Sequence, residues 1–200
     1  MRPAVVLSLA ALALLPAAPR AADFDSVART AGRIDSLEAF LARYIGHCTD
    51  VYERRKCEGN VALVRQEAAG HAFTVRVQDA AGLIRLERRG GGYLLLLTPF
   101  VDGGGLALTH GAPRRQDAEG RPLIDLISIP ATVPDGMMDM EYESPFRTGA
   151  IELEIVFRPE KVWKLQRRGE GGSYEGVAAR FLAVRVIDAR SGNPIAARVL

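Results

Sequence analysis

Cationic side chains surround the only tryptophan of the chain, Trp163. These cations are Arg158, Lys161, Lys164, Arg167 and Arg168. A tryptophan with interleaved cations can bind an acidic glycan, a phosphate head group or a protein. The same pattern is typical of an edge strand whose lysines prevent aggregation while the tryptophan packs inward, and we favour this simpler interpretation. The candidate ligand-binding residues are Trp163, Lys161, Lys164 and Arg158.

Soft and hard metal ligands occur together in residues 135–143, Asp-Gly-Met-Met-Asp-Met-Glu-Tyr-Glu. Thioether sulfur suits Cu(I), so Met137, Met138 and Met140, with the adjacent Asp139, are candidate metal ligands. The carboxylates of the stretch would instead suit Ca²⁺. Neither set has a recognised ligand spacing. We favour a loop whose methionines cover apolar core and whose acids face water, and we expect no cofactor.

Cys48 and Cys57 are the only cysteines of the chain. An even pair predicts a disulfide if the protein reaches an oxidising compartment. Redox-active pairs of the thioredoxin type have two intervening residues, whereas these cysteines have eight. The pair is therefore interpreted as a structural link between two helices.

The chain offers little for nucleophilic catalysis. It contains no Gly-x-Ser-x-Gly, Ser-x-x-Lys or His-Glu-x-x-His motif. Its histidines, His47, His71 and His110, are scattered, and each is interpreted as a turn or surface residue. A hydrolase would need residues that only folding brings together, so no catalytic residue is named.

The first 22 residues have the layout of a secretory signal peptide. Arg2 precedes the apolar run Ala4–Leu15, which is too short to span a bilayer, and small residues continue to Ala22. The whole chain has 26 Lys and Arg and 24 Asp and Glu; without Arg2 and Arg20, 24 of each remain. The expected mature protein is therefore near neutral, which gives no argument for nucleic-acid binding. It also has no apolar run of transmembrane length.

Alternating side chains predict a mainly β protein. In residues 150–158, Ile151, Leu153, Ile155 and Phe157 share one face, while glutamates occupy the other, as in a half-buried antiparallel strand. Further strands are predicted at 73–77, 83–87, 93–100, 106–109, 123–129, 162–166, 177–188 and 195–200. Residues 131–147 are expected to be irregular because they follow Pro130 and contain Pro134 and Pro145.

Helices are expected only in the N-terminal part. One is predicted from Asp35, with Glu38 completing a capping box and Gly46 ending it. A second is predicted over Asn60–Ala69, with Asn60 as the N-cap, and an earlier helical turn is expected within 23–33.

Two resemblances accompany these patterns. The phrase 184–199 resembles the strand–turn–strand of carboxypeptidase-regulatory-like β-sandwiches. More broadly, the segments 40–48, 108–113 and 157–163 resemble an uncharacterised family of short exported bacterial proteins. This second resemblance implies a fold unit and a location, with no assigned activity and no functional residue to transfer.

The sequence therefore predicts an α+β, mainly β protein: an antiparallel β-sandwich or open barrel with a short, disulfide-linked N-terminal helical segment. The expected organisation is a signal peptide (1–22), the helical segment (23–70) and an antiparallel β region (71–200), the last two packed as one domain. We expect a periplasmic or secreted, non-enzymatic envelope module that binds an anionic envelope polymer or an envelope protein, or has a structural role. The alternatives are a hydrolase or transferase acting on envelope polymers and, less favoured, a copper-binding protein.

Overall fold

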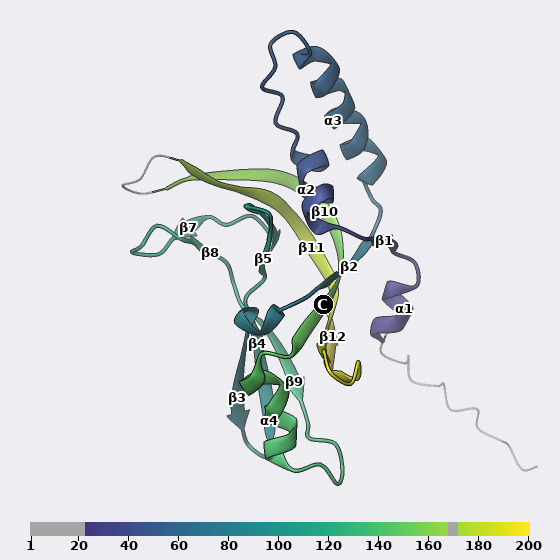
Figure 1. Cartoon of the computed structure of the whole chain (residues 1–200), viewed down its shortest axis with the longest axis vertical. Helices are drawn as coiled ribbons and strands as arrows, with labels where there is room; N and C mark the ends of the chain where they lie inside the picture. The colour runs from purple at the N-terminus through teal and green to yellow at the C-terminus, as the bar shows by residue number, and fades with distance from the viewer. Residues whose placement is uncertain (1–22, 168–171) are drawn as a thin grey trace, which may run out of the picture.

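The computed structural model describes residues 23–167 and 172–200, and the predicted signal peptide lies outside this range. The molecule is elongated, with helices at one end and a small sheet with its own helix at the other (Figure 1). The helices are α1 (Phe24–Ala28), α2 (Leu37–Ile45), α3 (Arg54–Ala68) and α4 (Asp139–Thr148), with a 3₁₀ turn at Ala80–Leu83. The strands are β1 (Gly32–Ile34), β2 (Phe73–Val77), β3 (Ile84–Arg89), β4 (Gly92–Leu97), β5 (Phe100–Gly103), β6 (Leu106–His110), β7 (Arg115–Gln116), β8 (Pro122–Leu123), β9 (Ile127–Ala131), β10 (Ile151–Gln166), β11 (Ser173–Asp188) and β12 (Pro194–Val199).

Two long antiparallel strands, β10 and β11, form the spine of the main sheet. Within the described residues this sheet has seven strands in the order β1-β2-β10-β11-β6-β5, and β12 pairs with β11. β2 and β12 border one half of the spine, whereas β6 borders the other half of β11. Most pairings are antiparallel, but β1–β2 and β6–β11 are parallel. The fold is thus mainly β, as predicted, and the main sheet does not close into a barrel.

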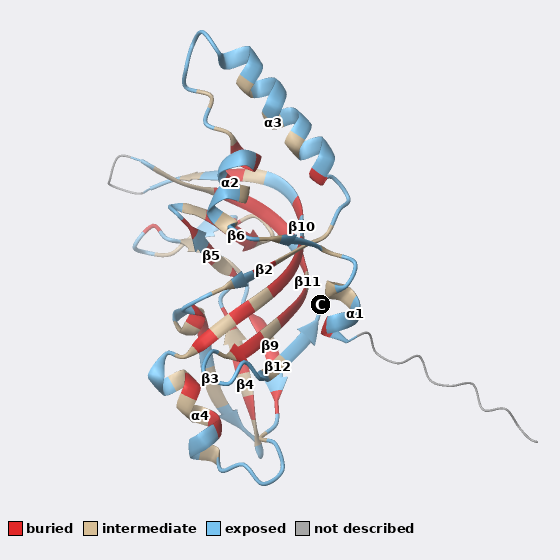
Figure 2. Ribbon diagram, turned by 45° about the vertical axis from the view of Figure 1, so that its right-hand side comes forward, coloured by how far each residue is buried: buried red, intermediate tan, exposed pale blue. Residues whose placement is uncertain are grey.

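The main core lies on one face of this spine, which we call the core face. Leu153, Ile155 and Phe157 of β10 and Phe181 and Val184 of β11 are all buried there. The second sheet, β3-β4-β9, and α2 contribute to the same core. Figure 2 shows the buried residues concentrated along the β10–β11 spine, while most of α3 is exposed.

The opposite face of the spine, which we call the outer face, carries two smaller apolar clusters. Phe24 of α1 covers Val156 and Ala183 in the first cluster. Trp163 packs with Ala107 and Ala178 in the second cluster, together with partly buried neighbours. Because side chains alternate along a strand, the residues of β10 and β11 that lie between these two clusters point in part to the core face and in part to the outer face.

The N-terminal helices are joined by the disulfide that the sequence predicts. Cys48 and Cys57 are bonded, with their Cα atoms 5.6 Å apart. Arg65 of α3 donates to the carbonyl oxygens of Tyr44 and Ile45 at 2.8 and 2.9 Å. These bonds satisfy acceptors that the end of α2 would otherwise leave open.

The observed N-termini of α2 and α3 correct the sequence prediction. Ser36, rather than Asp35, is the N-cap of α2, and its side chain accepts from the backbone N–H of Ala39. Gly46 ends α2 as predicted, with φ of 67°. α3 begins at Arg54, so Asn60 lies inside it and is not its cap.

The expectation that residues 131–147 are irregular is wrong, because α4 occupies much of this stretch. The carboxylate of Glu141 accepts from the backbone N–H of Met138, which caps the first turn, and Gly149 ends the helix in the left-handed region. Tyr142 stacks on Tyr93 of β4, with ring centroids 4.9 Å apart, which adds tertiary packing that outweighs Pro145. None of the helices within residues 23–167 and 172–200 is long and apolar enough to cross a membrane.

Candidate functional site

A β-bulge in β10 decides which cations lie together. Register with β11 shifts between Pro159 and Lys161, so Glu160 is an extra residue without a Cα partner. Simple alternation would place Arg158 and Lys161 on opposite faces. The extra residue instead brings Lys161 and Trp163 to the outer face, where Arg158 also lies.

Arg180 completes this group of cations. It is the register partner of Arg158 across β10 and β11, so the two side chains emerge from the same face directly opposite each other. Lys161, two register positions further along β10, is paired with Ala178. All three cations are exposed. We call Arg158, Lys161 and Arg180 the cationic cluster.

Trp163 lies beside the cluster on the same face, but its ring packs against the protein rather than facing solvent. The side chain is 7% exposed, and its indole Nε1 donates to Oγ1 of the buried Thr109 at 3.0 Å. Its ring centroid lies 6.2 Å from that of Phe100 of β5. This inward packing matches the edge-strand interpretation of Trp163.

Lys164 lies apart from the cluster. The register pairs it with Glu175 on the core-face side, and its Nζ lies 3.9 Å from a Glu175 carboxylate oxygen. His47, which follows α2, approaches the same carboxylate at 3.9 Å. At the far end of β10 the guanidinium of Arg167 lies 4.5 Å from the ring centroid of Tyr174. Arg168 is outside the described residues.

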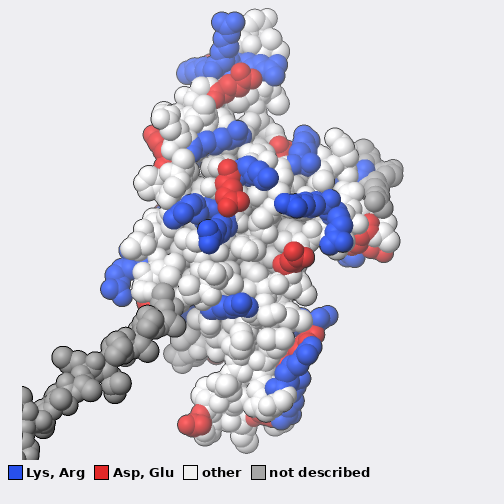
Figure 3. Space-filling view, turned by 180° about the vertical axis from the view of Figure 1, so that it is seen from behind, with Lys and Arg blue, Asp and Glu red and all other residues white. Residues whose placement is uncertain are grey.

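Positive charge is also prominent on the face of the molecule seen from behind (Figure 3). In Figure 3, Lys and Arg side chains form a broken band across the middle of the visible face, with fewer acidic side chains among them. Arg185 of β11 differs from the cations of the cluster because it is ion-paired. Its guanidinium nitrogens lie 2.7 Å from a carboxylate oxygen of Glu154 and 2.7 Å from one of Asp25.

The methionine-rich stretch is exposed, contrary to the expectation that its methionines cover the core. Met137, Met138 and Met140 are 43%, 60% and 65% exposed. The carboxylate of Asp139 forms an ion pair with Arg88 of β3, which already engages one of the four candidate metal ligands. Metal binding by these residues stays a prediction.

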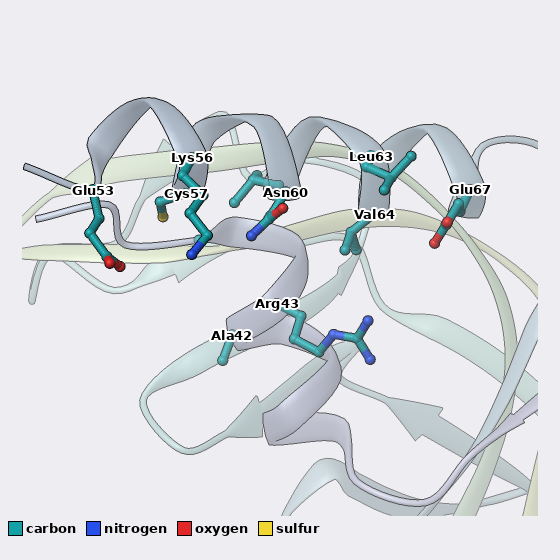
Figure 4. A pocket seen from close by; sticks show the side chains of 11 residues that line it. Ala42, Arg43, Glu53, Lys56, Cys57, Asn60, Leu63, Val64 and Glu67 are labelled. Carbon is teal, nitrogen blue, oxygen red and sulfur yellow. The ribbon is translucent and has the colours of Figure 1, made fainter. Parts of the chain in front are cut away.

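A hollow between α2 and α3 has a volume of about 670 Å³ (Figure 4). Val61, Leu63 and Val64 supply apolar lining, and Cys57 lies at one end. Its charged lining residues are Arg43 and Lys56 against Glu53 and Glu67. Because these charges cancel, the hollow lacks the excess of positive charge that the cationic cluster has.

A second polar group lies between α4 and β4. The phenol of Tyr93 donates to Oε1 of Glu143 at 2.7 Å, and this bond is the main reason that the pKa of Tyr93 is raised. The neighbouring Tyr142 is buried, which raises its pKa to about 12, and its hydroxyl has no partner among the described residues. Both tyrosines therefore stay protonated at neutral pH.

The histidines lie in three different settings, as their scattered positions suggested. His47 and His71 are exposed, whereas Nδ1 of His110 accepts from the backbone N–H of Phe181 at 3.0 Å. The part of the chain that the structure describes contains no group of three or more His, Cys, Asp or Glu side chains arranged to hold a metal ion.

Sequence reasoning missed Arg180 because its role depends on strand register. The segment 177–188 was predicted as a strand, but nothing local indicates that position 180 faces position 158. The extra residue at Glu160 was equally hidden, although Pro159 offered a signal, since proline in a strand favours a bulge or an edge.

Comparison with known proteins identifies a family but no named relative. No curated protein and no solved structure matches the chain. A family described as "Family of unknown function (DUF6066)" matches residues 1–199. This match covers nearly the whole chain and confirms the resemblance to an uncharacterised family. The protein therefore belongs to this family of unknown function, DUF6066.

Proposed function

We propose that this protein is an exported, non-enzymatic envelope module that binds an anionic envelope polymer through the cationic cluster. The observation that carries the proposal is the convergence of Arg158, Lys161 and Arg180 on one exposed patch of the outer face. No ion pair joins any of the three to an acid within residues 23–167 and 172–200, whereas other cations of the same spine are paired. Unneutralised surface cations attract polyanions and raise their association rate.

The rigidity of the platform supports this function. Next to the cluster, Thr109 and Trp163 link β6 to β10 by a hydrogen bond, and their side chains are 0% and 7% exposed. A site on rigid strands holds its side chains in place more accurately than a site on loops. Export is supported by the signal-peptide pattern of residues 1–22 and by the Cys48–Cys57 disulfide, a bond that persists in oxidising compartments.

One pair of lysines provides a matched test. Lys161 and Lys164 lie on the same strand, but only Lys161 belongs to the cationic cluster. We expect Lys161→Gln to weaken binding of immobilised dextran sulfate, a polyanion, by about threefold to tenfold, and Lys164→Gln to leave it nearly unchanged. Binding should also weaken as salt rises from about 0.05 M to about 0.5 M, because exposed charges are screened.

Uncharged dextran is the control ligand. If the wild-type protein bound dextran as well as dextran sulfate, or if both lysine variants lost binding equally, the cationic cluster would not be the binding site. Shortening of a polymer during the assay, seen by size-exclusion chromatography, would point instead to an envelope-polymer hydrolase.

A further inference from the structure

We infer that Arg158 and Arg180 form a clamp for one tetrahedral oxyanion, the phosphate or sulfate ester group of the polymer. This inference rests on the proposed function and names the chemical group that the site recognises. Its basis is that the two guanidinium groups come from register partners on the same face.

Placing Arg158 opposite Arg180 is unfavourable for the protein when no anion is bound. Like charges directly opposite each other in an antiparallel pair destabilise a sheet. Register shifts occur on both sides of the pair, between Val156 and Phe157 and between Pro159 and Lys161. Bulges of this kind re-aim side chains and are common beside functional sites.

Glu160, the nearest acid in the sequence, does not serve as the missing counterion. Burial lowers the pKa of His110, Glu160 raises it and Arg180 lowers it further, so both charges are felt at this imidazole. Among the described residues, however, no ion pair joins the Glu160 carboxylate to Arg158 or Arg180.

Geometry favours a tetrahedral group over a carboxylate. Register partners have Cβ atoms about 4.5–5.5 Å apart, so two arginine forks can converge on one small anion between them. A phosphate or sulfate ester directs its oxygens in several directions and can accept from both forks and from Lys161. A planar carboxylate has only two oxygens, whose lone pairs lie in one plane, so it accommodates two forks and Lys161 together less well.

The Arg158–Arg180 clamp can be tested with three polymers and two variants. Wild-type protein, Arg158→Gln and Arg180→Gln are titrated with polyphosphate, dextran sulfate and polygalacturonate, a carboxylate polymer. We expect wild type to prefer at least one tetrahedral polymer over polygalacturonate by about tenfold, and each variant to lose most of that preference. Preference between polyphosphate and dextran sulfate then shows whether the site favours phosphate or sulfate groups. Arg85→Gln, which removes an exposed and ion-paired arginine of β3, is the control.

Thermal unfolding supplies a second readout that does not depend on the ligand. Because each substitution removes a like-charge contact, Tm should stay level or rise by up to about 4 °C while affinity falls. Equal binding of polygalacturonate and the tetrahedral polymers, or a falling Tm with unchanged affinity, would overturn the clamp but leave polyanion binding intact. Wild-type protein that binds none of the three polymers would overturn both proposals.

Discussion

At the scale of single residues, the His110 side chain supplies a hydrogen-bond acceptor to β11 at the point where β6 stops pairing with it and β12 has not yet begun. β6 pairs with Gly176–Ala179 of β11, and β12 pairs with it from Ala183 onward. Phe181 lies in the gap, and its backbone N–H donates to Nδ1 of His110 at 3.0 Å. The imidazole must be unprotonated at Nδ1 to accept this bond, so sheet continuity depends on its charge state.

This contact predicts a pH-dependent stability. Burial lowers the pKa of His110 below its usual 6.5, opposed by Glu160 and reinforced by Arg180. The unfolded chain then binds the proton more readily, so the free energy of unfolding should fall as pH drops below about 6.5 and level off below the lowered folded-state pKa. Urea unfolding from about pH 8 to about pH 5 measures the effect.

Glutamine can test the origin of this dependence, because its carbonyl accepts a hydrogen bond but does not titrate. His110→Gln should flatten the fall in stability below about pH 6.5, whereas the same substitution at the exposed His71 should leave it unchanged. An unaltered pH profile in His110→Gln would assign the dependence to other groups.

At the scale of elements, close packing of β6 against β11 depends on Gly176. A Cβ at this position would lie 2.2 Å from the carbonyl oxygen of Ala107 and 2.8 Å from Cζ2 of Trp163. Neither the strand backbone nor the buried ring can yield cheaply. We expect Gly176→Ala to lower the free energy of unfolding by about 1–3 kcal/mol and to move Trp163, with a shift in its fluorescence.

Gly82→Ala is the matched control, because a Cβ there meets no atom within 4 Å. The protein has one tryptophan, so the fluorescence signal reports this site alone. Equal stabilities for the two variants would show that β6 can move aside without loss.

Elements that depend on local pattern were predictable from the sequence, and those that depend on tertiary context were not. The alternation of Ile151, Leu153 and Ile155 indicated a half-buried strand, and Gly46 marked the end of a helix. The sequence separated 150–158 from 162–166 because Pro159 interrupts the pattern, whereas β10 continues through a bulge. α4 was missed because packing of Tyr142 on Tyr93 outweighs the helix-breaking tendency of Pro145.

The same division applies to the candidate site. The residue types around Trp163 were evident from the sequence, and they included Arg158 and Lys161. Their grouping was not evident, because the bulge at Glu160 selects Lys161 over Lys164 and the register adds Arg180. A shift of one residue exchanges the two faces of a strand, so composition alone cannot determine such a cluster.

At the scale of the whole molecule, α3 projects from the body and is joined to it by few contacts. Ala68 is its only buried side chain; Arg65 holds it to the end of α2, and the Cys48–Cys57 bond holds it to the segment that follows α2. Reduction should therefore release α3 while the β10–β11 spine stays folded. Hydrogen exchange of oxidised and reduced protein should show faster exchange in α3 and unchanged protection in β10.

The chain-entropy model assigns about 2.5–3 kcal/mol to a closed loop of this length. The Cys48→Ser, Cys57→Ser double variant should reproduce the exchange pattern of the reduced protein. Equally fast exchange in α3 and β10 after reduction would mean that the disulfide stabilises the whole fold rather than one helix.

The position of the spine in the chain also has a consequence for the timing of folding. β2 and β6, at 73–77 and 106–110, both pair with the spine strands β10 or β11, which span 151–188. A chain that emerges with its N-terminus first therefore lacks the centre of its main sheet until most of its length is available. During that interval the earlier strands have no partner in the spine, so completion of the main sheet waits for the C-terminal third of the chain.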